Sequence, residues 1–169
     1  MKKRHPILRF FSHLFSTPWH VRRHFPKSAL HHIEQAITTS ESTHSGEIRF
    51  VVEGDLHPLD ILRGVTPRQR AITLFSQLGI WDTEQNNGVL IYLLLADHDV
   101  EILADRGINR HLGPQGWESI CKAMEARFRQ GKFEEGVIYG ITEIGKSLQQ
   151  HFPSAGEGKN ELSNRPIVL

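Results

Sequence analysis

The clearest pattern of apolar and polar residues lies between residues 89 and 104. The apolar run VLIYLLL at residues 89–95 is too short for a membrane span, which needs about 20 apolar residues. It is typical of a strand buried on both faces. After a polar turn, Val100, Ile102 and Ala104 occupy alternate positions, which predicts a second strand. Because the turn is short, we expect the two strands to be antiparallel neighbours.

A strand and a helix are predicted before this hairpin. Ile48, Phe50 and Val52 alternate within residues 47–53 and indicate a strand. Thr66 and Pro67 are a typical cap and first-turn pair for a helix that stops near Gly79. This strand–helix–strand order predicts two parallel strands joined by a right-handed crossover.

Helical spacing elsewhere completes the predicted architecture. A helix opens at Pro26, another begins near Pro114, and a third runs from about Phe133 to the residues before Pro153. We therefore predict an α/β fold, a three-layer α/β/α sandwich with a small mixed β-sheet and helices on both faces. The predicted divisions are a basic amphipathic segment (1–26), the α/β domain (27–153) and a disordered polar tail (154–169).

Composition narrows the class of protein. The 169 residues suit one domain, and a net charge of +1 gives no overall reason to expect nucleic acid as a partner. The single cysteine, Cys121, excludes an internal disulfide and fits a reducing compartment, so we expect a soluble cytoplasmic protein without a transmembrane segment. The P-loop, GxGxxG, HExxH and GxSxG motifs are all absent from the sequence.

The amino-terminal segment differs from the rest in charge. Its first 27 residues contain seven lysine and arginine side chains and no acidic ones. An apolar stripe among them suits peripheral contact with a membrane or a partner, or packing on the domain itself; it comprises Ile7, Phe10, Phe11, Leu14 and Phe15.

A candidate site follows from the predicted hairpin. The start of its first strand lies beside the end of its second, which brings Asp82 and Glu84 close to Asp105. With Glu47 at the same end of the sheet, these carboxylates predict a site for a divalent cation, and Arg106 could neutralise them or bind an anion. The alternative is that Asp82 and its neighbours are ordinary turn and cap residues. A second candidate lies at the opposite end, which open α/β sheets favour for ligands, at Asp55, Asp97, His98 and Asp99.

Residues 46–152 resemble the TPM domain family. The matching phrases, in order, are GEIRFVV (46–52), LFSQLGI (74–80), NGVLI (87–91), DVEI (99–102) and FRQGKFEEGV (128–137). The resemblance implies an α/β/α sandwich, acid phosphatase activity as in plant members of the thylakoid lumen, and Ca²⁺ binding as in some bacterial members. The chain is similar to the short soluble bacterial form, which implies membrane-bound TPM or LemA-type proteins as partners at the inner membrane.

Two functions from different classes are compatible with the sequence. The first is a non-catalytic interaction module that binds a divalent cation and works with membrane-associated partners. The alternative is a weak, metal-assisted acid phosphatase in which Asp82, Glu84 and Asp105 hold the cation and Arg106 binds phosphate. A zinc protein based on the 11 histidines is a third hypothesis.

Overall fold

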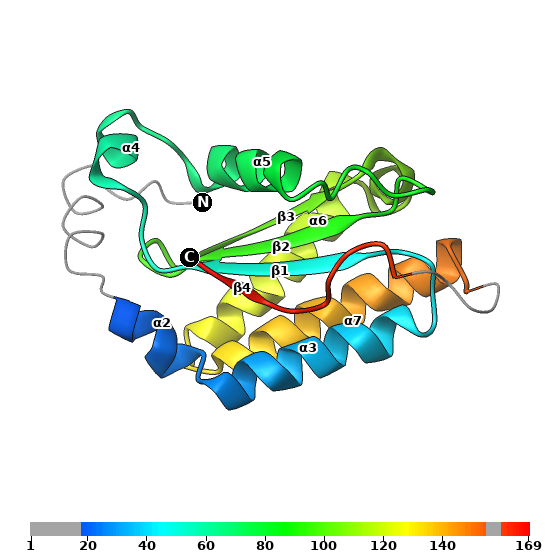
Figure 1. Cartoon of the computed structure of the whole chain (residues 1–169), viewed down its shortest axis with the longest axis horizontal. Coiled ribbons are helices and arrows are strands. Elements are labelled where there is room, and N and C mark those ends of the chain that lie inside the picture. Colours follow the sequence, from blue (N-terminus) through cyan, green and yellow to red (C-terminus); the bar gives the residue numbers. More distant parts are fainter. Residues whose placement is uncertain (1–17, 155–159) are drawn as a thin grey trace.

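A computed structural model describes residues 18–154 and 160–169 (Figure 1). The helices are α2 (Pro18–His24), α3 (Lys27–Glu41), α4 (Pro58–Leu62), α5 (Pro67–Gln77), α6 (Arg106–Phe128) and α7 (Phe133–His151). The strands are β1 (Ile48–Glu53), β2 (Val89–Leu94), β3 (Asp99–Ala104) and β4 (Ile167–Val168). The apolar stripe predicted within residues 7–15 lies outside the described residues.

The strands form one mixed sheet in the order β3-β2-β1-β4. Strand β1 is parallel to β2 and to β4, and β2 is antiparallel to β3. Helices α3, α6 and α7 cover one face, and α5 covers the other (Figure 1). Each face has its own apolar core, one around Phe50, Ile91 and Val137 and one around Leu74 and Tyr92. These findings confirm the predicted α/β fold and its mixed sheet with helices on both faces.

The start of α5 agrees with its sequence signature. Thr66 Oγ1 accepts a hydrogen bond from the Gln69 amide (3.2 Å), and Gln69 Oε1 accepts one from the Thr66 amide (2.9 Å). This reciprocal pair satisfies two amide groups that a helix start leaves without intrahelical partners. Pro67 supplies the fixed backbone angle of the first helical position. The helix therefore begins where the sequence predicts.

The sequence predicts a helix that begins near Pro114, but this prediction is wrong about the start, because residues 106–112 are also helical. Helix α6 begins at Arg106, because Asp105 Oδ1 accepts a 2.6 Å hydrogen bond from the Arg106 amide and caps the first turn. Gly113, with a φ of 66°, then breaks the helix immediately before Pro114. The predicted helix is thus the second half of a kinked helix whose first half precedes Gly113.

The carboxy-terminal residues 160–169 are not the disordered tail that their composition predicts. Strand β4 extends the sheet beside β1, and the Leu169 amide donates to the Val52 carbonyl (3.0 Å). The Glu47 carboxylate accepts hydrogen bonds from the amides of Glu161 (2.9 Å) and Leu162 (3.2 Å). The prediction fails because these stabilising partners lie more than 100 positions away in the sequence, where composition gives no information about them.

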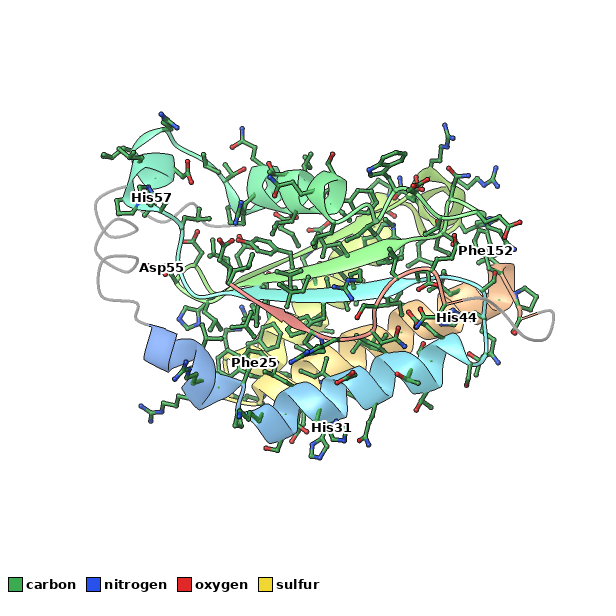
Figure 2. All side chains as sticks on the ribbon, in the orientation of Figure 1. Phe25, His31, His44, Asp55, His57 and Phe152 are labelled. Atoms are coloured by element: carbon green, nitrogen blue, oxygen red, sulfur yellow. The ribbon has the colours of Figure 1, made fainter. Side chains whose placement is uncertain are left out.

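The loop after α3 is fixed to the end of α7. The Ser45 amide donates to the Phe152 carbonyl (2.9 Å), and His44 forms an isolated bridge with Pro153. Figure 2 shows His44 and Phe152 at this same end of the molecule. In the part of the chain that the structure describes, no helix combines the length and apolar character needed to cross a bilayer.

Candidate functional site

The outer edge of strand β3 lies in a groove between α5 and α6. Strand β3 is at the end of the sheet, so within residues 18–154 and 160–169 one of its sides has no neighbouring strand. The groove has a volume of about 500 Å³ and runs along all six residues of β3. Its walls come from α5 (Arg68, Phe75) and from α6 and its kink (Asn109, Pro114, Trp117, Glu118, Cys121, Lys122, Glu125). A strand edge at the end of a sheet, beside a groove, is a place where another extended chain can pair.

The main-chain groups of alternate β3 residues face this groove. The Asp105 amide donates inward to the Gly88 carbonyl, whereas the Ile102 carbonyl accepts outward from Arg68. Because hydrogen-bonding directions alternate along a strand, the amide and carbonyl groups of Val100 and Ala104 also point outward. The edge therefore directs donors and acceptors outward at Val100 and Ala104, whereas the Ile102 backbone is bonded to Arg68 and Cys121.

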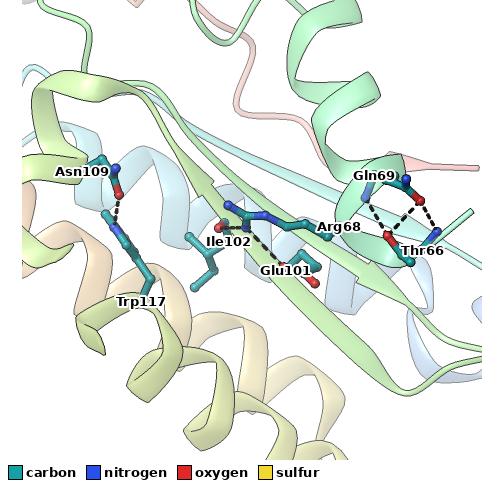
Figure 3. A network of polar contacts seen from close by, with 7 residues as sticks. All are labelled: Thr66, Arg68, Gln69, Glu101, Ile102, Asn109 and Trp117. Carbon is teal, nitrogen blue, oxygen red and sulfur yellow. Dashed lines mark hydrogen bonds and ion pairs between the residues drawn. The ribbon is translucent and has the colours of Figure 1, made fainter. Parts of the chain in front are cut away.

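Arg68 occupies the middle of this edge. Its Nη1 atom lies 2.9 Å from the Ile102 carbonyl oxygen and 3.2 Å from Glu101 Oε2 (Figure 3). Just over half of the Arg68 side chain is exposed (53%), whereas Glu101 is mostly covered (16%). A charged side chain placed on an edge strand protects it from indiscriminate pairing. Arg68 comes from α5, is about half exposed and belongs to neither apolar core.

Carboxylates dominate the electrostatics of the groove. Burial raises the pKa of Glu101; Arg68 opposes this effect and Glu125 adds to it. Burial also raises the pKa of the Cys121 thiol to about 12; a hydrogen bond with the Ile102 backbone opposes this, and the charges of Glu101, Glu125 and Asp99 add to it. Cys121 is therefore a protonated thiol at neutral pH and not a nucleophile. Glu101 is paired with Arg68 (3.2 Å) and Glu125 with Arg129 (3.7 Å).

Two lining residues of the groove, Trp117 and Asn109, are joined by a hydrogen bond. The indole Nε1 of Trp117 donates a 2.9 Å hydrogen bond to Asn109 Oδ1 (Figure 3). Trp117 is buried, with 6% of its surface exposed. This bond holds together the two halves of α6 on either side of its kink. The Asn109 side-chain oxygen is thus used within α6.

The loop that the sequence placed beside Asp105 does lie there. The Gly107 amide donates to the Asn86 carbonyl (2.9 Å), and Arg106 Nε donates to Asn86 Oδ1 (3.1 Å). Asn87 is fully buried, and its Nδ2 donates to the Ser45 carbonyl (3.1 Å). The side chains of Asn86 and Asn87 therefore attach this loop to α6 and to the residues before β1.

The four candidate carboxylates have separate surroundings. Asp82 and Glu84 are exposed, Asp105 caps α6, and Glu47 holds the carboxy-terminal segment. Among residues 18–154 and 160–169, no group of three or more His, Cys, Asp or Glu side chains is arranged to hold a metal ion. Cation binding by these residues, and anion binding by Arg106, stay predictions.

Sequence reasoning missed a buried polar network at the carboxyl end of β1. Arg70 makes two hydrogen bonds to Glu53, Nε to Oε2 (2.9 Å) and Nη2 to Oε1 (2.8 Å). The phenol of Tyr92 donates to the same Oε2 atom (2.6 Å). An acidic residue ending a buried strand was the available signal for it. All three side chains are satisfied by one another, so the network has a structural role.

Comparisons with known proteins were made for the whole chain. A protein-family model described as the TPM domain matches residues 24–147. The solved structure of the BA42 protein from the psychrophilic bacterium Bizionia argentinensis is 30% identical, with a TM-score of 0.74, and the match covers 84% of this chain and 93% of that one. The amino-terminal domain of a protein from P. gingivalis is 21% identical, with a TM-score of 0.57 and coverages of 70% and 72%, and shows a similar fold. No curated protein matches the sequence.

Proposed function

Because the chain belongs to the TPM domain family, whose shared fold does not by itself define an activity, we propose a function from its surface: a non-catalytic interaction module. The module binds an extended segment of a partner protein along the edge of β3. The observation that carries this proposal is the groove of about 500 Å³ that follows the outer edge of β3 along its whole length.

Strand addition accounts for the features of the groove. A partner strand gains affinity from main-chain hydrogen bonds to an open edge and specificity from pockets for alternate side chains. Here the outward groups of Val100 and Ala104 supply the hydrogen bonds, and α5 and α6 form walls on the two sides. The Ile102 carbonyl becomes available once Arg68 turns away from it. No reactive nucleophile is needed, which agrees with the protonated state of Cys121.

The class of partner comes from the family resemblance. Membrane-bound TPM or LemA-type proteins at the inner membrane are the proposed partners, and the basic residues at the amino terminus support contact with an anionic membrane surface. Pull-down and liposome flotation, with the full chain and with a chain lacking residues 1–15, test this part. Equal behaviour of the two chains in both assays would exclude a role for that segment.

A direct test uses a short test peptide of alternating valine and lysine residues with capped ends. Nuclear magnetic resonance of the ¹⁵N-labelled chain should show slower hydrogen exchange at the amides of Val100 and Ala104 when the peptide is added. The control is the same peptide with N-methyl groups on the alternate residues that face β3, which removes donors but keeps every side chain. If both peptides act alike, or neither acts, strand addition is excluded.

Metal-assisted acid phosphatase activity is the alternative function. It is supported by the family resemblance and by the contact between the loop of residues 82–87 and the start of α6. In this proposal Asp82, Glu84 and Asp105 hold Ca²⁺ or another divalent cation, and Arg106 binds phosphate. Hydrolysis of a generic phosphomonoester should then depend on added cation and disappear in Asp82→Asn and Asp105→Asn. Hydrolysis that persists in both variants would reject it.

A further inference from the structure

The charges that line the groove are unevenly divided. Among the residues that the structure describes, its lining contains four carboxylates, Asp99, Glu101, Glu118 and Glu125, and two basic side chains, Arg68 and Lys122. Lys122 pairs with Glu118 (2.7 Å) at the surface, where both side chains are more than 60% exposed. Arg68 is therefore the basic side chain that meets the middle of the strand edge.

The carboxylates lie on both sides of the edge. Glu101 projects from β3 and contacts Arg68 of α5, while Glu125 belongs to α6. Glu101, Cys121 and Glu125 all line the groove, and Glu125 also pairs with Arg129 of the same helix end (3.7 Å). A strand entering the groove alternates its side chains between these two sides.

We infer that the segment bound by β3 is basic, with lysine or arginine side chains that replace Arg68 as the partner of Glu101. The inference rests on the proposed function. When Arg68 leaves, a main-chain amide of the incoming strand takes its place at the Ile102 carbonyl, and a basic side chain of that strand takes its place at Glu101. The two hydrogen bonds that Arg68 now makes are thus replaced by one from the partner's backbone and one from a partner side chain.

Charge also distinguishes this occupant from a second copy of the chain. Two β3 edges paired with each other would bring two sets of carboxylates together, and like charges placed opposite each other are unfavourable. A basic segment instead gains attraction at the same positions and is drawn toward the groove before contact. Complementarity of charge therefore favours a basic partner strand over self-association.

The test compares three capped peptides of the form Thr-Xaa-Val-Xaa-Val-Xaa-Thr, with lysine, threonine or glutamate at Xaa. Isothermal titration should show the lysine peptide binding about tenfold more tightly than the threonine peptide, as expected for one or two partly buried charge pairs, and the glutamate peptide most weakly. High salt should reduce these differences. Equal binding of all three would overturn the inference and leave the proposed function intact, whereas no binding by any peptide would overturn both.

A pair of variants assigns the effect to one carboxylate. Glu101→Gln should reduce the ratio between lysine- and threonine-peptide affinities to about twofold, because the attraction at the centre of the groove is lost. Glu135→Gln, on the exposed start of α7 outside the groove, changes the net charge equally and should leave the ratio unchanged. A purely structural effect of Glu101→Gln would weaken both peptides alike, and an unchanged ratio would contradict the inference.

Discussion

The phenol of Tyr92 donates a 2.6 Å hydrogen bond to Oε2 of Glu53 between two parallel strands at the centre of the sheet. Arg70 holds both oxygens of the same carboxylate. Burial raises the pKa of Tyr92, and the charge of Glu53 raises it further, so the phenol stays protonated and acts as a donor. The pKa of Arg70 is raised by its hydrogen bonds to Glu53. A buried carboxylate is thereby compensated from two sides.

Removing the Tyr92 hydroxyl group should lower the stability of the protein while leaving the sheet intact. Tyr92→Phe deletes a hydrogen bond to a charged group and leaves Glu53 with Arg70 alone, so the free energy of unfolding should fall by about 1–2 kcal/mol. Urea denaturation measures this change. Tyr139→Phe is the matched control, because Tyr139 packs its ring against Arg127 (3.7 Å) and keeps that contact as phenylalanine. Equal losses in the two variants would show that the Glu53 hydrogen bond contributes nothing specific.

Arg68 should act as a competitor for the partner strand. Arg68→Gln removes the guanidinium that now bonds to the Ile102 carbonyl, so the threonine peptide should bind a few-fold more tightly, since about 1 kcal/mol of hydrogen bonding no longer has to be replaced. Titration calorimetry measures the gain. Arg63→Gln, at the exposed end of α4, provides the same change of charge away from the groove. A loss of affinity in Arg68→Gln would mean that Arg68 is part of the binding surface and not a competitor.

Glu41 should make the stability of the protein depend on pH. Burial raises its pKa from 4.5 to about 8, although its Oε1 accepts a 2.8 Å hydrogen bond from the Ile48 amide. Because this carboxyl binds its proton more tightly when folded, its contribution is fully present below pH 4.5 and is lost as pH rises toward 8. The slope is at most about 1.4 kcal/mol per pH unit.

The Glu41→Gln variant isolates this contribution. Burial lowers the pKa of His44 from 6.5 to about 4. Its contribution to the free energy of unfolding is therefore lost as pH falls from 6.5 toward 4, opposite to the contribution of Glu41. Because both chains contain His44, its contribution cancels in the difference between them, and unfolding free energies should be compared between pH 6.5 and 8. Over this window the unmodified chain should lose stability relative to Glu41→Gln. Parallel curves would show that Glu41 ionises normally in the folded protein.

Gly107 should tolerate no side chain. A Cβ atom there would collide with the backbone carbonyl oxygens of Asn86 and Gln85, so Gly107→Ala must displace the loop or the start of α6. We expect a loss of about 1–3 kcal/mol in chemical denaturation, as for other overpacked positions. Gly116→Ala is the control on the same helix, where the nearest atoms belong to the Leu112 side chain. A loss in Gly116→Ala as large as that in Gly107→Ala would argue against a specific collision.

The same contact shows how far the candidate site could be predicted. The hairpin pattern correctly placed the residues around Asn86 beside Arg106, because strand pairing aligns the two ends of a hairpin. The availability of their oxygen atoms could not be predicted in the same way, because Asp105 and Asn109 accept hydrogen bonds from groups within α6 itself. Whether an oxygen atom is available for a ligand depends on such local partners, which a residue type does not reveal.

The sequence by itself determined the elements whose signals are local. The apolar run around β2, the capping residues Thr66 and Gln69, and the breaks at Gly79 and Gly113 each act through neighbours within a few positions. Tertiary structure decided the rest: β4 pairs with a strand more than 100 residues away, and Arg68 reaches an edge that exists only after α5, β3 and α6 have packed. Periodicity and capping follow from short-range geometry, whereas an open strand edge and its charge result from where separate elements meet.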